Sequence, residues 1–184
     1  MKHIIPALLL AASVPAFAAD NAASTADAAP VATYAVPTPA GFSFAVETQV
    51  LADDSYQVKI TDQKTGKVQI IEEIIDFGPL KEKISGLVNI QDYNGDGHPD
   101  IAVRGVGTYS QSADELYLFN PATRQFQTPP VGQDIAIVGN VEVIRKGCIR
   151  VDYKSSIMDY DEEDYCWKNG GWEMLRPQKH QRTQ

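Results

Sequence analysis

The sequence has 184 residues, of which 43% are hydrophobic and 22% are charged, and its formal net charge at pH 7 is −8. This balance is typical of a globular protein and excludes collagen-like and wholly disordered chains. The negative charge disfavours nucleic acid and anionic lipid as partners, and it favours cations or a basic protein. The length predicts one domain, with a core that does not require metals or many disulfides.

The first 18 residues are typical of a bacterial secretory signal peptide. Lys2 precedes an apolar stretch from Ile4 to Phe17, and small residues on both sides of Phe17 form a cleavage site. The alternative is an N-terminal membrane anchor, but the stretch is short for a bilayer span, and no cysteine near the cleavage site offers a lipid attachment. We therefore expect Sec-dependent export to the periplasm or beyond, without a membrane anchor. Residues 19–40, rich in Ala, Thr, Ser and Pro, predict a disordered linker.

Residues 41–176 predict a single all-β domain, followed by a flexible tail at 177–184. Short runs of β-branched and aromatic residues alternate with polar residues, and turn signals separate the runs. Strands are expected at 42–51, 54–62, 67–77, 84–92, 100–106, 115–120, 133–139, 141–145, 148–153, 164–168 and 172–176. Reversals are expected at Thr65-Gly66, Asn120-Pro121, Lys146-Gly147 and Asn169-Gly170-Gly171. About ten short strands without a helix predict an antiparallel sandwich or a small propeller-like barrel.

The chain contains two cysteines, Cys148 and Cys166. An oxidising compartment favours a disulfide between them. Zinc is the competing explanation, but two thiols without neighbouring histidines make only half of a zinc site.

One segment, Asp92-Tyr93-Asn94-Gly95-Asp96-Gly97-His98-Pro99-Asp100, has the pattern of a calcium loop. Calcium requires six to eight oxygen ligands, and oxygen-bearing side chains stand here at positions 1, 3, 5 and 9. The predicted ligands are three carboxylates, one amide and one backbone carbonyl: Asp92, Asn94, Asp96, Asp100 and the carbonyl of His98. Val103 at position 12 and the flanking strands depart from the EF-hand and are similar to the loop of FG-GAP repeats. The alternative is an Asx-rich turn that binds nothing.

Enzymatic activity is not expected. His3 lies in the leader, His98 in the predicted metal loop and His180 in the tail, and no GxSxG, HExxH or phosphate-loop pattern occurs. A glycosidase that uses two carboxylates stays open as an alternative, because the distance between carboxylates is not visible in a sequence.

The order of the motifs resembles a known family. QDYNGDGHPDIAV is followed by LYLFNPATRQF, then by GCIRVDYKSS and YCWKNGGWEML. This order is similar to that of periplasmic calcium-binding β-proteins that confer immunity against peptidoglycan-cleaving effectors of type IV secretion systems, a group similar in structure to inhibitors of invertebrate-type lysozyme. The resemblance covers about residues 84–175 and implies a calcium-stabilised protein inhibitor of a secreted lysozyme-like hydrolase. The lipid anchor of the best-known member type does not carry over, since the cysteine is missing.

Such inhibitors typically occlude the catalytic cleft with a protruding loop. The segment after the calcium loop offers Arg104 for a catalytic carboxylate, and Tyr109 and Ser110 for contacts that imitate sugar. Its alternative interpretation is a flexible connection. The acidic segment 159–165 is a second candidate surface, through Tyr160 and Glu162, for a cationic hydrolase. It could also be a solvated loop or a weak second calcium site.

A carbohydrate-binding or adhesion module is the rival function, because FG-GAP-like loops also occur in such proteins. Exposed, parallel aromatic rings would favour it, and the candidates are Tyr109, Tyr117, Trp167 and Trp172. In strands, however, aromatic residues more often form the core or cross-strand pairs.

Overall fold

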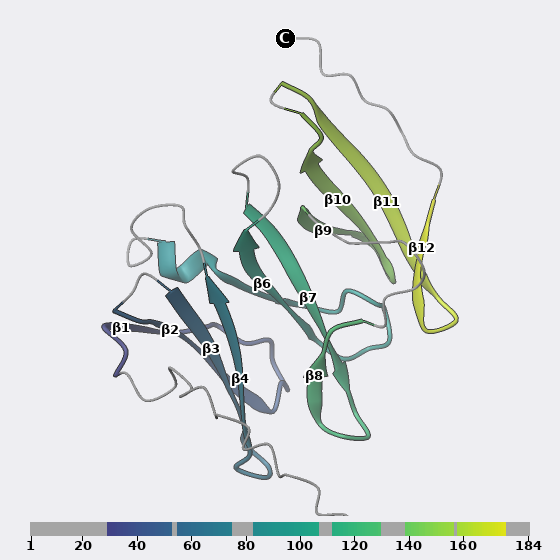
Figure 1. Ribbon diagram of the computed structural model, residues 1–184. Coiled ribbons are helices and arrows are strands. Elements are labelled where there is room, and N and C mark those ends of the chain that lie inside the picture. Colours follow the sequence, from purple (N-terminus) through teal and green to yellow (C-terminus); the bar gives the residue numbers. More distant parts are fainter. Residues whose placement is uncertain are drawn as a thin grey trace, which may run out of the picture.

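The computed structural model describes residues 29–52, 55–74, 83–106, 112–129, 139–156 and 158–175. These residues form twelve strands in three antiparallel sheets of four strands each. The prediction of an all-β fold is confirmed. The sheets are stacked like a sandwich and do not close into a barrel, and Figure 1 shows that they follow one another in chain order. No helix in the described part of the chain has the length and apolarity of a membrane span.

The N-terminal sheet has the order β1-β2-β3-β4. Its strands are β1 (Ala32–Ala35), β2 (Phe44–Val50), β3 (Ser55–Asp62) and β4 (Val68–Ile74). Strand β1 corrects part of the linker prediction, because Ala32 to Ala35 pair with Glu47 to Val50 of β2. The segment is held by this backbone ladder and by the ring of Tyr34, which packs against the core shared with the middle sheet. The first part of the predicted linker and the signal peptide lie outside the described residues.

The middle sheet has the order β5-β6-β7-β8 and is covered on both faces. A 3₁₀ turn (Ile84–Gly86) precedes its strands, which are β5 (Val88–Gln91), β6 (Asp100–Val106), β7 (Ser112–Asn120) and β8 (Gln125–Gln127). Ile101 and Val103 join the core shared with the N-terminal sheet, whereas Ala102 joins the core shared with the C-terminal sheet. This alternation along β6 explains why the segment reads as one continuous apolar run.

The C-terminal sheet has the order β12-β11-β10-β9. Its strands are β9 (Asn140–Arg145), β10 (Cys148–Lys154), β11 (Tyr160–Lys168) and β12 (Gly171–Met174). The alternative interpretation of the acidic segment 159–165 as a solvated loop is wrong, because most of this segment belongs to β11. Residues from Tyr160 pair in continuous register with β10, up to Cys166 opposite Cys148. Cross-strand hydrogen bonding and the buried ring of Tyr165 outweigh the low strand propensity of the acidic residues.

Polar side chains at the sheet edges join the N-terminal sheet to the middle sheet. Arg124 donates two hydrogen bonds to the carboxylate of Asp62, at 2.7 and 2.8 Å, and this guanidinium holds the pKa of Asp62 well below its usual range. The side-chain amide of Gln69 on β4 forms two hydrogen bonds with the backbone of Phe126 on β8, at 2.7 and 3.0 Å. The relative position of these two sheets is therefore fixed at their edges as well as in the core.

Candidate functional site

The predicted calcium loop connects β5 to β6 and is tightly wound. The carboxylate of Asp92 accepts hydrogen bonds from the backbone N–H groups of Gly95, at 2.7 Å, and Gly97, at 3.0 Å. Both glycines have positive φ angles, 76° and 92°, which favour glycine over other residues. The glycines at these two positions therefore allow the chain to wrap around the side chain of Asp92.

The next two predicted ligands contact each other. The side-chain amide of Asn94 donates to the carboxylate of Asp96 over 3.1 Å. Each of the two side-chain oxygens also accepts from the backbone two residues ahead, Asn94 from Asp96 at 3.0 Å and Asp96 from His98 at 2.8 Å. These turns hold the side chains at alternate positions on one side of the loop.

Asp100 ends the loop and is completely buried. One of its carboxylate oxygens accepts hydrogen bonds from the backbone of Tyr93 and Asn94, and the other accepts from Phe119 at the end of β7, at 2.9 Å. Burial raises the pKa of Asp100 to about 6, although these three donors favour the charged form. Asp100 therefore joins the loop to the middle sheet.

The oxygen atoms that the loop offers are of the types that bind calcium. Carboxylate, amide and carbonyl oxygens are the ligands that calcium prefers, and they stand at the spacing of a cation-binding loop. His98 contributes no ring nitrogen to the loop, since its ring packs against Phe119 with the ring centres 5.5 Å apart. In the described ranges, however, no group of three or more His, Cys, Asp or Glu side chains gathers in a way that could hold a metal. Each carboxylate is turned toward backbone N–H groups, so calcium binding stays a prediction.

Arg104 lies at the base of the connection between β6 and β7. Its guanidinium donates to the buried carboxylate of Asp114 at 2.6 Å and to the hydroxyl of Ser112 at 3.3 Å. Asp114 also accepts from the backbone of Val141 in the C-terminal sheet, at 3.0 Å. The structure thus gives Arg104 a bracing contact within the protein, and its predicted contact with a catalytic carboxylate stays a prediction. Tyr109 and Ser110 lie outside the described residues.

The outer face of the C-terminal sheet carries the second candidate surface. Arg150 forms two hydrogen bonds with Asp164, at 2.8 and 3.2 Å, and lies 3.6 Å from the carboxylate of Glu162. A hollow of about 380 Å³ opens here, lined by Asn140, Val141, Glu142, Arg150, Asp152 and Glu162. Tyr160 at the end of β11 is 47% exposed. Tyr160 and Glu162 therefore belong to one face. Three carboxylates and one arginine line its hollow, and the ammonium of Lys154 lies 5.8 Å from the centre of the Tyr160 ring.

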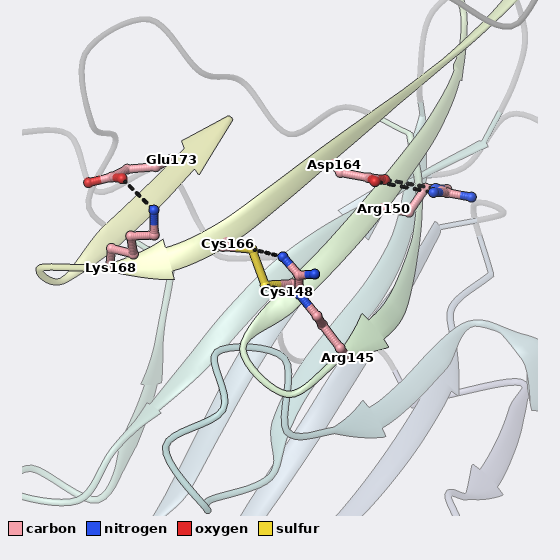
Figure 2. The surroundings of a disulfide bond; sticks show 7 residues. All are labelled: Arg145, Cys148, Arg150, Asp164, Cys166, Lys168 and Glu173. Carbon is pink, nitrogen blue, oxygen red and sulfur yellow. Dashed lines mark hydrogen bonds and ion pairs between the residues drawn. A yellow bond between two sulfur atoms is a disulfide. The ribbon is translucent and has the colours of Figure 1, made fainter. Parts of the chain in front are cut away.

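The predicted disulfide between Cys148 and Cys166 is confirmed. Figure 2 shows the guanidinium of Arg145 next to both sulfur atoms, at 3.2 and 3.5 Å, and the Arg150–Asp164 pair farther along the same two strands. Sequence analysis missed Arg145 and Arg150 as members of this surface. The signal was present for Arg150, because the alternation of CIRVDYK places every second residue from Cys148 on one face.

The described aromatic residues do not form a flat platform for sugar. Trp172 is buried, and the rings of Trp167 and Trp172 meet edge to face, with an interplanar angle of 74°. Tyr117 packs partly buried against the core of the N-terminal and middle sheets.

The fold is shared with a solved structure. No family model matches the chain, and no curated protein matches it in sequence. A solved structure described as that of a Xanthomonas type IV secretion system related protein is similar to this chain, with a TM-score of 0.52 and 18% identity. The similarity covers 78% of this chain and 79% of the other. At this identity, the comparison shows that the two chains share their fold.

Proposed function

We propose that the protein is a periplasmic inhibitor of a peptidoglycan hydrolase, of the kind that protects a bacterium against effectors of type IV secretion systems. The observation that carries the proposal is the shared fold with a type IV secretion system related protein. The order of three sequence motifs supports it independently, since it resembles that of immunity proteins. The Cys148–Cys166 disulfide is compatible with an exported protein.

The mechanism that we propose is occlusion of the catalytic cleft without covalent chemistry. The outer face of the C-terminal sheet supports an electrostatic part in binding, because Glu142, Asp152, Glu162 and Asp164 surround Arg150 there. Such a face attracts a cationic enzyme and repels an anionic one. The exposed ring of Tyr160, with the ammonium of Lys154 over it, adds an aromatic contact of the kind enriched in protein interfaces.

One structural calcium ion is part of the proposal. Asp92, Asn94, Asp96, Asp100 and the carbonyl of His98 would hold it, and its charge would offset the repulsion among three carboxylates in one short loop. The chain's own contribution is the winding of the loop around Asp92 and its attachment to the middle sheet through Asp100. We propose no catalytic role for the ion.

A lysis assay tests the function directly. The purified protein is added to lysozymes of the invertebrate, chicken and goose types and to bacterial muramidases, and the clearing of a peptidoglycan suspension is followed with calcium and with excess chelator. We expect slower clearing by at least one enzyme, weakened in the double variant Tyr160→Ala/Glu162→Gln. The matched control is Lys64→Gln in the β3–β4 turn of the N-terminal sheet, which should inhibit like the wild type. Clearing at an unchanged rate with every enzyme, in both conditions, would refute the inhibitor proposal.

A further inference from the structure

The candidate calcium loop touches the turn between β9 and β10, backbone against backbone. A Cβ atom built on Gly95 would lie 2.6 Å from the backbone nitrogen of Gly147 and 2.7 Å from its Cα. A Cβ atom built on Gly147 would lie 3.0 Å from the carbonyl oxygen of Asn94. A side chain at Gly95 has no room against the backbone of Gly147, and a Cβ atom at Gly147 would push the Asn94 carbonyl away by a few tenths of an ångström. The close approach of the two segments therefore depends on glycine at both positions.

The β9–β10 turn, which the loop contacts, is held in place by strand β11. The carbonyl of Gly147 accepts a hydrogen bond from the backbone of Trp167 at 2.8 Å. The next residue, Cys148, is bonded to Cys166 on β11. Because the β9–β10 turn is held by β11 in these two ways, a clash at Gly147 is relieved more easily by moving the calcium loop than by moving the turn.

We infer that the β9–β10 turn is the surface against which the ion-binding loop packs, here called its seat, and that Gly147 is a positioning residue for the cation. This inference rests on the proposed calcium site. It adds that Gly147, which is far from the loop in the sequence, supports the position of the loop. The carbonyl that Gly147 faces belongs to Asn94, whose side chain contacts that of Asp96. A shift of the Asn94 backbone therefore moves two proposed ligands together, and the affinity for calcium falls.

The test compares Gly147→Ala with Gly170→Ala. Both glycines have positive φ angles, 67° and 83°, so alanine costs similar backbone strain at either position. Gly170 has nothing within 4 Å of the added Cβ atom, whereas Gly147 has the Asn94 carbonyl at 3.0 Å. We expect calcium affinity, measured by titration calorimetry, to fall about tenfold or more in Gly147→Ala and to match the wild type in Gly170→Ala.

A second pair keeps the test decisive if Gly147→Ala does not fold. Gly147→Asn and Gly170→Asn place the same Cβ atoms, but asparagine tolerates the left-handed region better than alanine. The unfolding midpoint of each variant is measured in chelator and in calcium. The calcium-induced increase should shrink in Gly147→Asn and be retained in Gly170→Asn.

The outcomes separate this inference from the calcium proposal. A wild-type protein that binds no calcium would refute the proposed ion site, and the inference would fall with it. If the wild type binds calcium and the Gly147 variants bind it equally well, the ion site stands and the seat is refuted. Loss of affinity in the Gly147 variants alone supports both.

Discussion

The two interfaces between the sheets differ in how they are fastened. The interface of the N-terminal and middle sheets has an aromatic cluster, with Phe44 and Phe126 in contact at 5.2 Å, and the Asp62–Arg124 pair at its edge. Among the described residues, the interface of the middle and C-terminal sheets has more buried polar atoms without a hydrogen-bond partner. Within the described ranges, the hydroxyl of Tyr93 and the indole nitrogen of Trp172 are buried there without a hydrogen-bond partner, whereas at the first interface only Thr48 has such an atom.

This difference indicates that the two interfaces have different roles in the protein. Buried polar atoms without partners are costly, so the second interface depends on additional connections. These connections are the Asp114 carboxylate, which accepts from the backbone of Val141, and the contact of the calcium loop with Gly147. The first interface is a scaffold, and the second is where ion binding and a partner would act on the fold.

The largest expected effect is the loss of a core isoleucine from either interface. Ile60 lies in the first core and Ile149 in the second, and both are at most 1% exposed. Replacement of either by alanine should lower the free energy of unfolding by about 2–5 kcal/mol, measured by urea denaturation. Ile70, which is 40% exposed on β4, is the matched control and should cost far less. We expect one transition in each variant, because both cores share the middle sheet. Separate transitions would show that the two interfaces unfold independently.

A smaller effect, confined to the second interface, is expected from calcium. At a concentration of 100 times the dissociation constant, calcium should stabilise the wild type by about 2.7 kcal/mol. Asp96→Ala should lose this gain but unfold near the wild type in chelator, since Asp96 is an exposed residue. His98→Ala is the control that should retain the gain, because His98 is expected to use its backbone carbonyl. Equal melting of the wild type and Asp96→Ala in calcium would argue that the loop binds no ion.

The smallest effect, confined to acid, concerns the first interface. The pKa of Asp62 is held below its unfolded value by Arg124, so the stability due to this pair is present above about pH 4. It is lost progressively as the pH falls further, because Asp62 is then protonated only in the unfolded chain. The difference in melting temperature between the wild type and Asp62→Asn should therefore be constant from pH 7 to about 4 and narrow below it. A difference that stays constant down to pH 2 would contradict the pair's contribution.

Local features of the fold were predictable from the sequence. The four reversals lie between consecutive strands where expected, and Gly66, Gly147 and Gly170 have the positive φ angles that such turns require. The disulfide followed from two cysteines in a chain that was predicted to be exported. These predictions succeed because each depends on a few neighbouring residues or on a single pairing choice.

Features that depend on distant segments were missed. Strand β1 has one large side chain, that of Tyr34, and is ordered by pairing with β2. The acidic residues of β11 would disfavour a strand if they were isolated, but pairing with β10 brings Arg150 next to Asp164. The contact of Gly95 with Gly147 joins positions 52 residues apart, and no periodicity of either segment could indicate it.

The contact of Gln69 with strand β8 has a consequence for the solubility of the protein. Among the described strands, β8 lies at the edge of the middle sheet, and it is only three residues long. The side chain of Gln69 satisfies both the N–H and the C=O group of Phe126, at the centre of that strand, as a neighbouring peptide unit would. A second molecule therefore finds these groups already occupied, and addition of a foreign strand, the first step of sheet-mediated aggregation, is blocked at this position.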